Sequence, residues 1–173
     1  MWIASFDVGI RNFAFAVLDW KGNESNFEII DLQNIDITVT KKIEKDVARD
    51  IIEVLEAYQS LWDQCDYFII EQQMQFRHAT NIKALKISQF VLCYFCIHCK
   101  DKTIVEYPAY HKTQVLGAPV GLKKYDRKKW VVEYFTRILK QRGEEYLLKD
   151  FTKRDDICDC LSLILAYAIQ NNL

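Results

Sequence analysis

The sequence predicts an α/β protein in which a mixed five-stranded sheet is flanked by helices, and three observations lead to this prediction. Residues 1–37 alternate apolar runs with turn residues, as in an antiparallel meander. Beyond them, stretches of helical periodicity alternate with short apolar runs, as in parallel strands joined by crossover helices. Half of the 173 residues are hydrophobic, which suits one domain over residues 1–173 with a sizeable core.

The expected elements follow in chain order. Apolar runs bounded by turn residues predict strands at 2–6, 13–20, 27–37, 65–71 and 102–107. Apolar positions that recur every three or four residues predict helices at 40–63 and 81–100, a third helix that ends at Gly143, and a last helix from about Lys153. The basic segment 122–130 forms the entrance of the third helix, and Lys112 lies in the loop that precedes this segment.

Charge and cysteine content narrow the class of protein. Twenty-three basic residues stand against twenty-four acidic ones, so contact with nucleic acid must come from local segregation of charge. There is no run of about eighteen apolar residues and no basic-then-apolar leader, which predicts a soluble, intracellular protein that does not span a membrane. Cys93, Cys96, His98 and Cys99 imitate a zinc cluster, but consecutive helical positions point to different sides, so we expect free thiols.

Two carboxylates end predicted strands. Asp7 follows the first strand, and Glu71 closes the strand at 65–71. Because a crossover helix makes these two strands parallel, both acids are expected at the same edge of the sheet. Asp7 with a glycine two positions later is also an ordinary turn sequence, whereas a charge at the end of a buried strand is typical of an ion pair or a metal ligand.

The entrance of the last helix carries three more acids. Asp155 forms, with Thr152, the pattern of a capping box. Asp156 and Asp159 share one helix face, where like charges repel and require a cation. That cation is either a basic neighbour, Arg154 or Lys153, or a divalent metal held by oxygen ligands.

The strand-end and helix-entrance acids together predict a metal site. Four carboxylates at one sheet edge would raise one another's pKa, and a pair of divalent ions about 3.5–4 Å apart is the usual solution, suited to attack of water on a phosphodiester. Five basic residues around Asp126 would hold the phosphate backbone, although a lone cluster of this kind is more often a solvated face. The five are Lys123, Lys124, Arg127, Lys128 and Lys129.

Four short motifs, in this order, resemble a known family. They are Phe6-Asp7-Val8-Gly9-Ile10-Arg11-Asn12, Ile69-Ile70-Glu71-Gln72-Gln73, Tyr125-Asp126-Arg127-Lys128-Lys129 and Lys153-Arg154-Asp155-Asp156-Ile157-Cys158-Asp159. The chain resembles, over essentially its whole length, the Holliday junction resolvases of the RuvC-like, ribonuclease H-like superfamily. The poxvirus resolvases resemble it most, and the fungal mitochondrial enzymes come next.

The resemblance implies a homodimer that binds four-way DNA junctions and cuts two opposing strands symmetrically. It implies two Mg²⁺ or Mn²⁺ ions per active site, no nucleotide cofactor and, for a poxvirus-like protein, action in the host cytoplasm. By motif match, the metal-binding acids are Asp7, Glu71, Asp156 and Asp159. The catalytic lysine is Lys128, with Lys129 and Lys112 as alternatives, and Lys112 and Asp155 are accessory residues.

The expected DNA contacts come from basic residues outside the acid cluster. Relatives commonly carry arginine where Gln72 stands here, so we expect that phosphate contact to shift to Arg77. The full set is Arg11, Arg77, Lys123, Lys124, Arg127 and Lys129. Three alternatives remain, namely a related nuclease acting on RNA or hybrid duplexes, a junction-binding relative without activity, and a sugar-kinase or actin-like ATPase. The last needs two Asp-x-Gly domains, and the chain has one such motif.

Overall fold

The computed structural model describes residues 1–9, 12–37, 44–73 and 81–173. Five strands form one sheet in the order β3-β2-β1-β4-β5, which confirms the predicted mixed sheet. The meander strands β1 (Trp2–Val8), β2 (Phe13–Asn23) and β3 (Asn26–Ile35) pair antiparallel. The strands β4 (Cys65–Gln72) and β5 (Thr103–Pro108) extend the sheet in parallel from β1.

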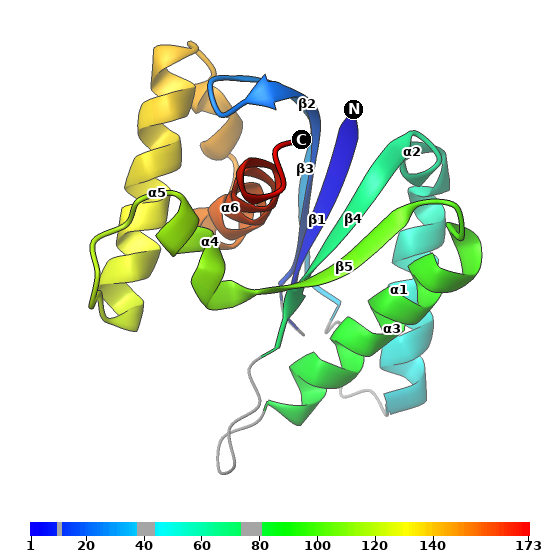
Figure 1. The fold of residues 1–173 in the computed structure, drawn as a ribbon. Coiled ribbons are helices and arrows are strands. Elements are labelled where there is room, and N and C mark those ends of the chain that lie inside the picture. The colour runs from blue at the N-terminus through cyan, green and yellow to red at the C-terminus, as the bar shows by residue number, and fades with distance from the viewer. Residues whose placement is uncertain (10–11, 38–43, 74–80) are drawn as a thin grey trace.

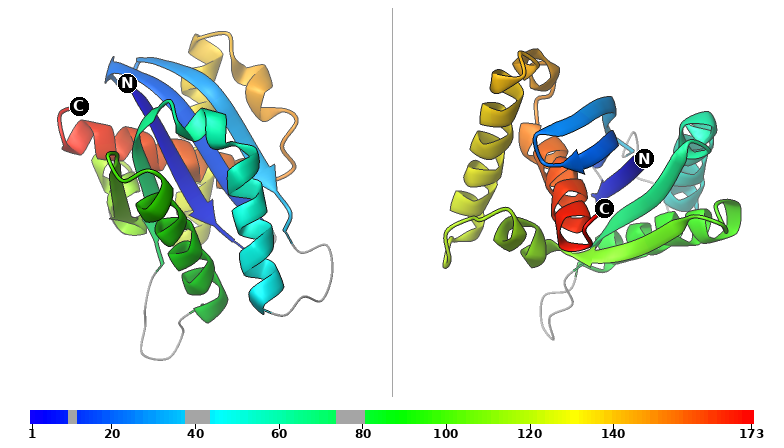
Figure 2. Two further views of the ribbon diagram at one scale, coloured as in Figure 1. Left: turned by 90° about the vertical axis from the view of Figure 1, so that its right-hand side faces the viewer. Right: turned by 45° about the horizontal axis from the view of Figure 1, so that its top comes forward.

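Helices cover both faces of the sheet (Figure 1). One face carries α1 (Glu44–Ala57), the short α2 (Gln59–Trp62) and α3 (Ile82–His98). The other carries α4 (Ala109–Val115), α5 (Lys124–Gln141) and α6 (Arg154–Gln170), with a 3₁₀ turn at Glu145–Leu148 (Figure 2). None of the helices in the described ranges has the length and apolar character needed to cross a bilayer.

Side-chain alternation divides the sheet between two cores. Phe6 and Phe68 face α3, where Phe68 stacks on Phe95 with ring centroids 4.1 Å apart. Ile3 and Ile69 face α6. Because the strand period is two, Asp7 and Glu71 belong to the face of Ile3 and Ile69, and thus to the α6 side.

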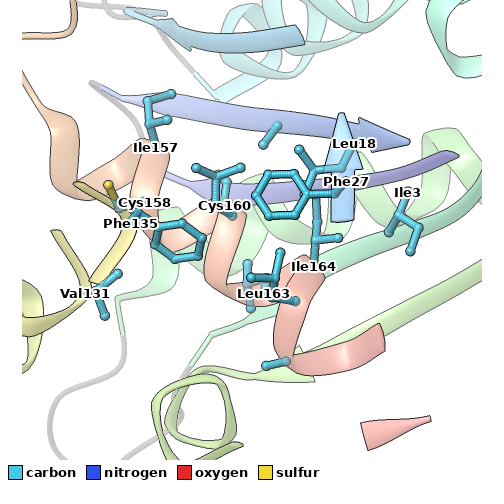
Figure 3. Close-up of a cluster of buried hydrophobic side chains, with 14 of the residues drawn as sticks. Ile3, Leu18, Phe27, Val131, Phe135, Ile157, Cys158, Cys160, Leu163 and Ile164 are labelled. Carbon is cyan, nitrogen blue, oxygen red and sulfur yellow. The ribbon is translucent and has the colours of Figure 1, made fainter. Parts of the chain in front are cut away.

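The helix α6 is buried along nearly its whole length. Cys160, Leu163 and Ile164 pack against strand residues such as Leu18, while α5 covers the helix from outside (Figure 3). A helix that is apolar all round suits this place between a sheet and other helices. The packing fixes where the polar first turn of α6 meets the sheet.

Three local predictions were wrong. The helix expected over 40–63 is divided at Tyr58 into α1 and α2, and residues 40–43 lie outside the described part. At this break the buried indole of Trp62 donates a hydrogen bond to the Leu55 carbonyl over 2.7 Å. Lys112 lies on α4 and not in a loop. This helix follows Pro108, and the sequence did not predict it because it is too short to show a helical periodicity. The strand β1 continues to Val8, so that Asp7 stands inside it rather than in a turn.

Candidate active site

The parallel pairing of β1 and β4 brings two carboxyl groups together. Phe6 lies opposite Ile70 in the ladder, so Asp7 and Glu71 follow at neighbouring positions of adjacent strands. The two carboxyl groups lie close enough that, in addition to burial, the Glu71 charge raises the pKa of Asp7. The predicted meeting of these acids at one edge is therefore confirmed.

The helix α6 delivers its acids to the same place through a buried contact with β1. The Ser5 hydroxyl donates a hydrogen bond to the Cys160 carbonyl over 2.8 Å, and both residues are fully buried. Asp159, one residue earlier, is thereby held beside the strand ends. Asp156, one turn before Asp159, accepts a hydrogen bond of 3.4 Å from the Asn34 amide of β3.

Lys112 occupies the centre of the cluster. Its Nζ lies 2.8 Å from Glu71 Oε1 and 3.0 Å from Asp159 Oδ1, and its side chain is 6% exposed. Burial alone would lower the pKa of Lys112, but the charges of Glu71, Asp159 and Asp7 outweigh burial and raise this pKa. The buried ammonium is therefore charged. Lys112, expected as an accessory residue and as an alternative catalytic lysine, touches two of the four predicted metal-binding acids.

Lys128 approaches the cluster from α5 on its solvent side. Its Nζ lies 2.5 Å from Asp155 Oδ2 and 3.9 Å from Asp156 Oδ1. Burial would raise the pKa of Asp155, but the Lys128 ammonium outweighs it and lowers this pKa. The predicted capping box is wrong: Lys153 stands at the N-cap without a side-chain cap, and Asp155 binds the Lys128 ammonium, since a charged partner makes the stronger hydrogen bond.

Lys129 points away from the acids, as the rotation of about 100° between neighbouring helical residues requires. Its Nζ lies 3.7 Å from Glu133 Oε1 on the exposed side of α5. Lys123 and Lys124 are also exposed, at the start of this helix. Arg11 and Arg77, two further predicted DNA contacts, lie outside the described residues.

The cluster opens into a cleft of about 480 Å³. Acidic and basic side chains line it together: Asp7, Glu71, Asp159, Lys112, Lys124, Arg127 and Lys128. Burial raises the pKa of Asp7 well above its usual value, with a further increase from the Glu71 charge. Burial also raises the pKa of Asp159, whereas Lys112 overcomes burial at Glu71 and lowers that pKa. Two lysines thus neutralise only part of the negative charge.

The donor chemistry of the cluster fits a hard divalent cation, because carboxylate oxygens are the ligands that Mg²⁺ and Mn²⁺ prefer. Burial and the Glu71 charge raise the pKa of Asp7 although the Lys112 charge lowers it, so a further cation would stabilise the Asp7 carboxylate. Within the ranges that the structure describes, however, no three His, Cys, Asp or Glu side chains already converge as a metal site. In this arrangement, the Lys112 ammonium supplies the positive charge between Glu71 and Asp159.

Asn34 is a site residue that the sequence analysis missed. It lies on β3 opposite Ala14 and reaches Asp156 across the end of the sheet. An asparagine in a half-buried edge strand carries no local signal of such a role. Only the crossing of α6 beneath β3 reveals it.

The geometry can now be compared with known proteins. A family model described as Poxvirus A22 protein matches residues 1–171. The chain belongs to this family. It is 34% identical to "Uncharacterized protein 97L" of Invertebrate iridescent virus 3, with 95% of this chain and 98% of that protein covered. It is 30% identical to the Holliday junction resolvase of Fowlpox virus (strain NVSL), with 96% and 92% covered.

Two solved structures share the fold over nearly the whole chain. The Fowlpox virus resolvase in complex with its substrate Holliday junction DNA gives a TM-score of 0.68 at 23% identity, with 100% of this chain and 99% of that one covered. Thermus thermophilus RuvC gives 0.72 at 18% identity, with 99% and 95% covered. These similarities confirm the ribonuclease H-like fold that the four motifs implied.

Proposed function

We propose that this protein is a Holliday junction resolvase, a metal-dependent endonuclease that makes paired nicks in four-way DNA junctions. The observation that carries the proposal is the acid cluster, in which Asp7, Glu71 and Asp159 meet at one sheet edge beside two lysines. The Fowlpox virus relative named as a Holliday junction resolvase supports this substrate. The alternation of charge along the cleft suits a DNA strand whose phosphate must approach buried carboxylates.

Four acids would hold the metal, namely Asp7, Glu71, Asp156 and Asp159. Two bound Mg²⁺ or Mn²⁺ ions would lower the pKa of the attacking water and neutralise charge that develops on the phosphate. The chain itself supplies the frame: β1 and β4 fix two acids through their ladder, and the Ser5–Cys160 hydrogen bond fixes the helix that carries the others. Because these carboxylates are already held in place, little reorganisation energy would be needed when charge develops during the reaction.

The lysines would act at different positions. Lys128 is 39% exposed and faces the cleft, so its ammonium can contact a phosphate oxygen while Asp155 orients it. Lys112 is buried among the acids and would adjust their charge and position. Lys123, Lys124, Arg127 and Lys129 would contact the DNA backbone without regard to base sequence.

We further propose a two-fold symmetric homodimer, because paired nicks in opposing strands require two active sites with opposite orientation. The viral relatives suit an enzyme that processes branched viral DNA, and the poxvirus-like motifs point to the host cytoplasm as its place of action.

A cleavage assay tests the proposal. A mobile four-way junction, a linear duplex and an RNA–DNA hybrid of the same sequence are each incubated with Mg²⁺ or with a chelator. We expect Mg²⁺-dependent nicks in two opposing strands of the junction alone. Asp7→Asn should bind the junction without cutting it, while Asp150→Asn, which alters an exposed acid, should behave as wild type.

Preferential cutting of the hybrid would favour a ribonuclease instead. Junction binding without cutting by the wild-type protein would favour a non-enzymatic binder. Equal cutting in the chelator would contradict the role of the acids.

A further inference from the structure

A second, smaller hollow adjoins the cleft. Its volume is about 100 Å³, and it lies between α4, the loop at 117–121 and the first turns of α5. Tyr110, Thr113 and Arg127 line both this pocket and the acid cleft. A group bound in the pocket is therefore the immediate neighbour of a group bound at the acids.

The backbone of this loop is held by specific contacts. The Ala118 amide donates a hydrogen bond to the Thr113 carbonyl over 2.9 Å, and the Gly117 amide donates to the Gln114 carbonyl over 3.1 Å. Gly117 adopts a φ of 80°, which a side chain would disfavour, and ends α4 in the manner of a left-handed cap. These two hydrogen bonds and the conformation of Gly117 therefore fix the backbone that forms the pocket wall at the end of α4.

The short helix α4 contributes residues to both the pocket and the acid cluster. Lys112, one residue before Thr113, is buried against Glu71 and Asp159. Tyr110 and Gln114 are one helical turn apart and both line the pocket. Any substrate group in the pocket is therefore placed at a fixed distance from the acid cluster.

The chemistry of the lining suits a flat ring with a hydrogen-bonding edge. Tyr110 is 48% exposed and offers an aromatic face, and Gln114 and Arg127 offer an amide and a guanidinium. Among the described residues that line the pocket, Arg127 is the one cation, whereas four described cations line the cleft: Lys112, Lys124, Arg127 and Lys128. The pocket is therefore less suited than the cleft to a phosphate.

Val120 adds a second observation. It belongs to the pocket wall, yet its side chain is fully exposed, at 103%. An apolar side chain presented in this way at a DNA-binding rim is typical of residues that insert between bases and unstack them. Bases at a branch point have lost part of their stacking and are the easiest to displace.

We propose that this pocket receives one nucleobase of the nucleotide next to the cleaved phosphodiester, and that it thereby determines which sequences are cut. The inference rests on the proposed junction-cleaving function. Tyr110 stacks on the base, Val120 displaces it from its neighbour, and the amide of Gln114 reads its edge, as glutamine does with adenine and arginine with guanine.

The test is single-turnover cleavage of fixed junctions that differ only in the base on either side of the cut, with all four bases and an abasic nucleotide at each position. Wild type, Tyr110→Ala, Gln114→Ala and Gln114→Glu are compared. Tyr146→Ala serves as the control because Tyr146 is an exposed tyrosine that is not among the residues lining the pocket or the cleft. Thermal melting checks that each variant is folded.

We expect the wild type to discriminate among bases at one flanking position by about tenfold or more, as a bidentate side-chain contact does, and to lose rate on the abasic junction. Tyr110→Ala and Gln114→Ala should flatten this discrimination. Gln114→Glu, which replaces a donor by an acceptor, should change the preferred base, which a merely structural residue would not do. Tyr146→Ala should retain the wild-type order of bases.

The inference is overturned if the folded variants keep the wild-type order of bases, or if the wild type cuts abasic and intact junctions equally. In both cases the wild type still cuts junctions, so the proposed function survives. A wild-type protein that cuts no junction overturns both.

Discussion

Replacement of Lys112 by methionine should lower the free energy of unfolding by about 3–5 kcal/mol, the usual result of removing one partner from a buried ion pair. Methionine keeps most of the aliphatic stem and removes the ammonium. Glu71 and Asp159 would then remain buried without the charge that lies 2.8 Å and 3.0 Å from them. Few single substitutions reach this magnitude without opening a cavity.

The magnitude follows from the two distances. At an effective dielectric constant of about 20, unit charges at these separations attract by about 6 and about 5.5 kcal/mol. Several kcal/mol of this attraction are offset by the desolvation of the Lys112 ammonium, whose side chain is 6% exposed. The remainder agrees with the range for broken buried pairs, and discounting for solvent is small because Glu71 and Asp159 are 15% and 13% exposed.

The assay is urea unfolding at neutral pH in a chelator, followed by fluorescence. With a slope of about 2 kcal/mol/M, the midpoint of Lys112→Met should fall by about 1.5–2.5 M. Lys129→Met is the matched control, because the Lys129 side chain is 66% exposed and its ammonium lies beside the exposed Glu133, and it should change stability by less than about 0.5 kcal/mol.

A second comparison isolates the charge. The combined variant Lys112→Met, Glu71→Gln, Asp159→Asn also removes the two buried carboxylates that would be left without a cation, and it should recover most of the lost stability. Mg²⁺ should also stabilise Lys112→Met in proportion to its binding, since a ligand of the folded state adds its linkage free energy. A loss below about 1 kcal/mol for Lys112→Met, or no recovery in the combined variant, would refute the assignment of Lys112 as the charge that holds the acids.

Three further outcomes are expected. In a chelator, Asp7→Asn should be more stable than wild type at neutral pH and as stable as wild type in acid. Because the folded-state pKa of Asp7 is raised, the wild type has its full stability below the unfolded pKa of about 3.9 and loses stability as the pH rises through the folded value. Urea midpoints over a pH series that show no such trend would contradict this. Lys128→Ala should lose about 10²–10³ in the rate of single-turnover cleavage with less than about tenfold loss of junction affinity. Lys129→Ala should instead lose more junction affinity than cleavage rate in the same assays. Equal behaviour of the two variants would count against the geometry. Ser5→Ala should cost about 0.5–1.5 kcal/mol in urea unfolding because it removes the buried hydrogen bond from the Ser5 hydroxyl to the Cys160 carbonyl, whereas Ser88→Ala should be neutral, since the buried Ser88 hydroxyl has no hydrogen-bond partner among the described residues.

The sequence by itself determined the five strands and the long helices, and it predicted that two acids meet at one edge of the sheet. Alternating and helical periodicities are local properties, so they located the five strands and the long helices to within a few residues. The parallel pairing of β1 with β4 also follows from order along the chain, because a crossover helix leaves few other arrangements. That pairing was enough to bring Asp7 and Glu71 to one edge. The rotation between neighbouring helical residues likewise separated Lys128 from Lys129 in advance.

Only the tertiary structure decided which cation stands among the acids. Lys112 lies on a seven-residue helix, too short for periodicity to predict, and its contacts with Glu71 and Asp159 join three elements that are distant in sequence. Asn34 reaches Asp156 for the same reason, across the crossing of α6 and β3. Asp155 matched a capping pattern, yet an ammonium brought by α5 competed successfully for its carboxylate. Such contacts depend on how buried faces pack against one another, and packing sums many weak, non-local interactions that leave no mark on the spacing of residues in the chain.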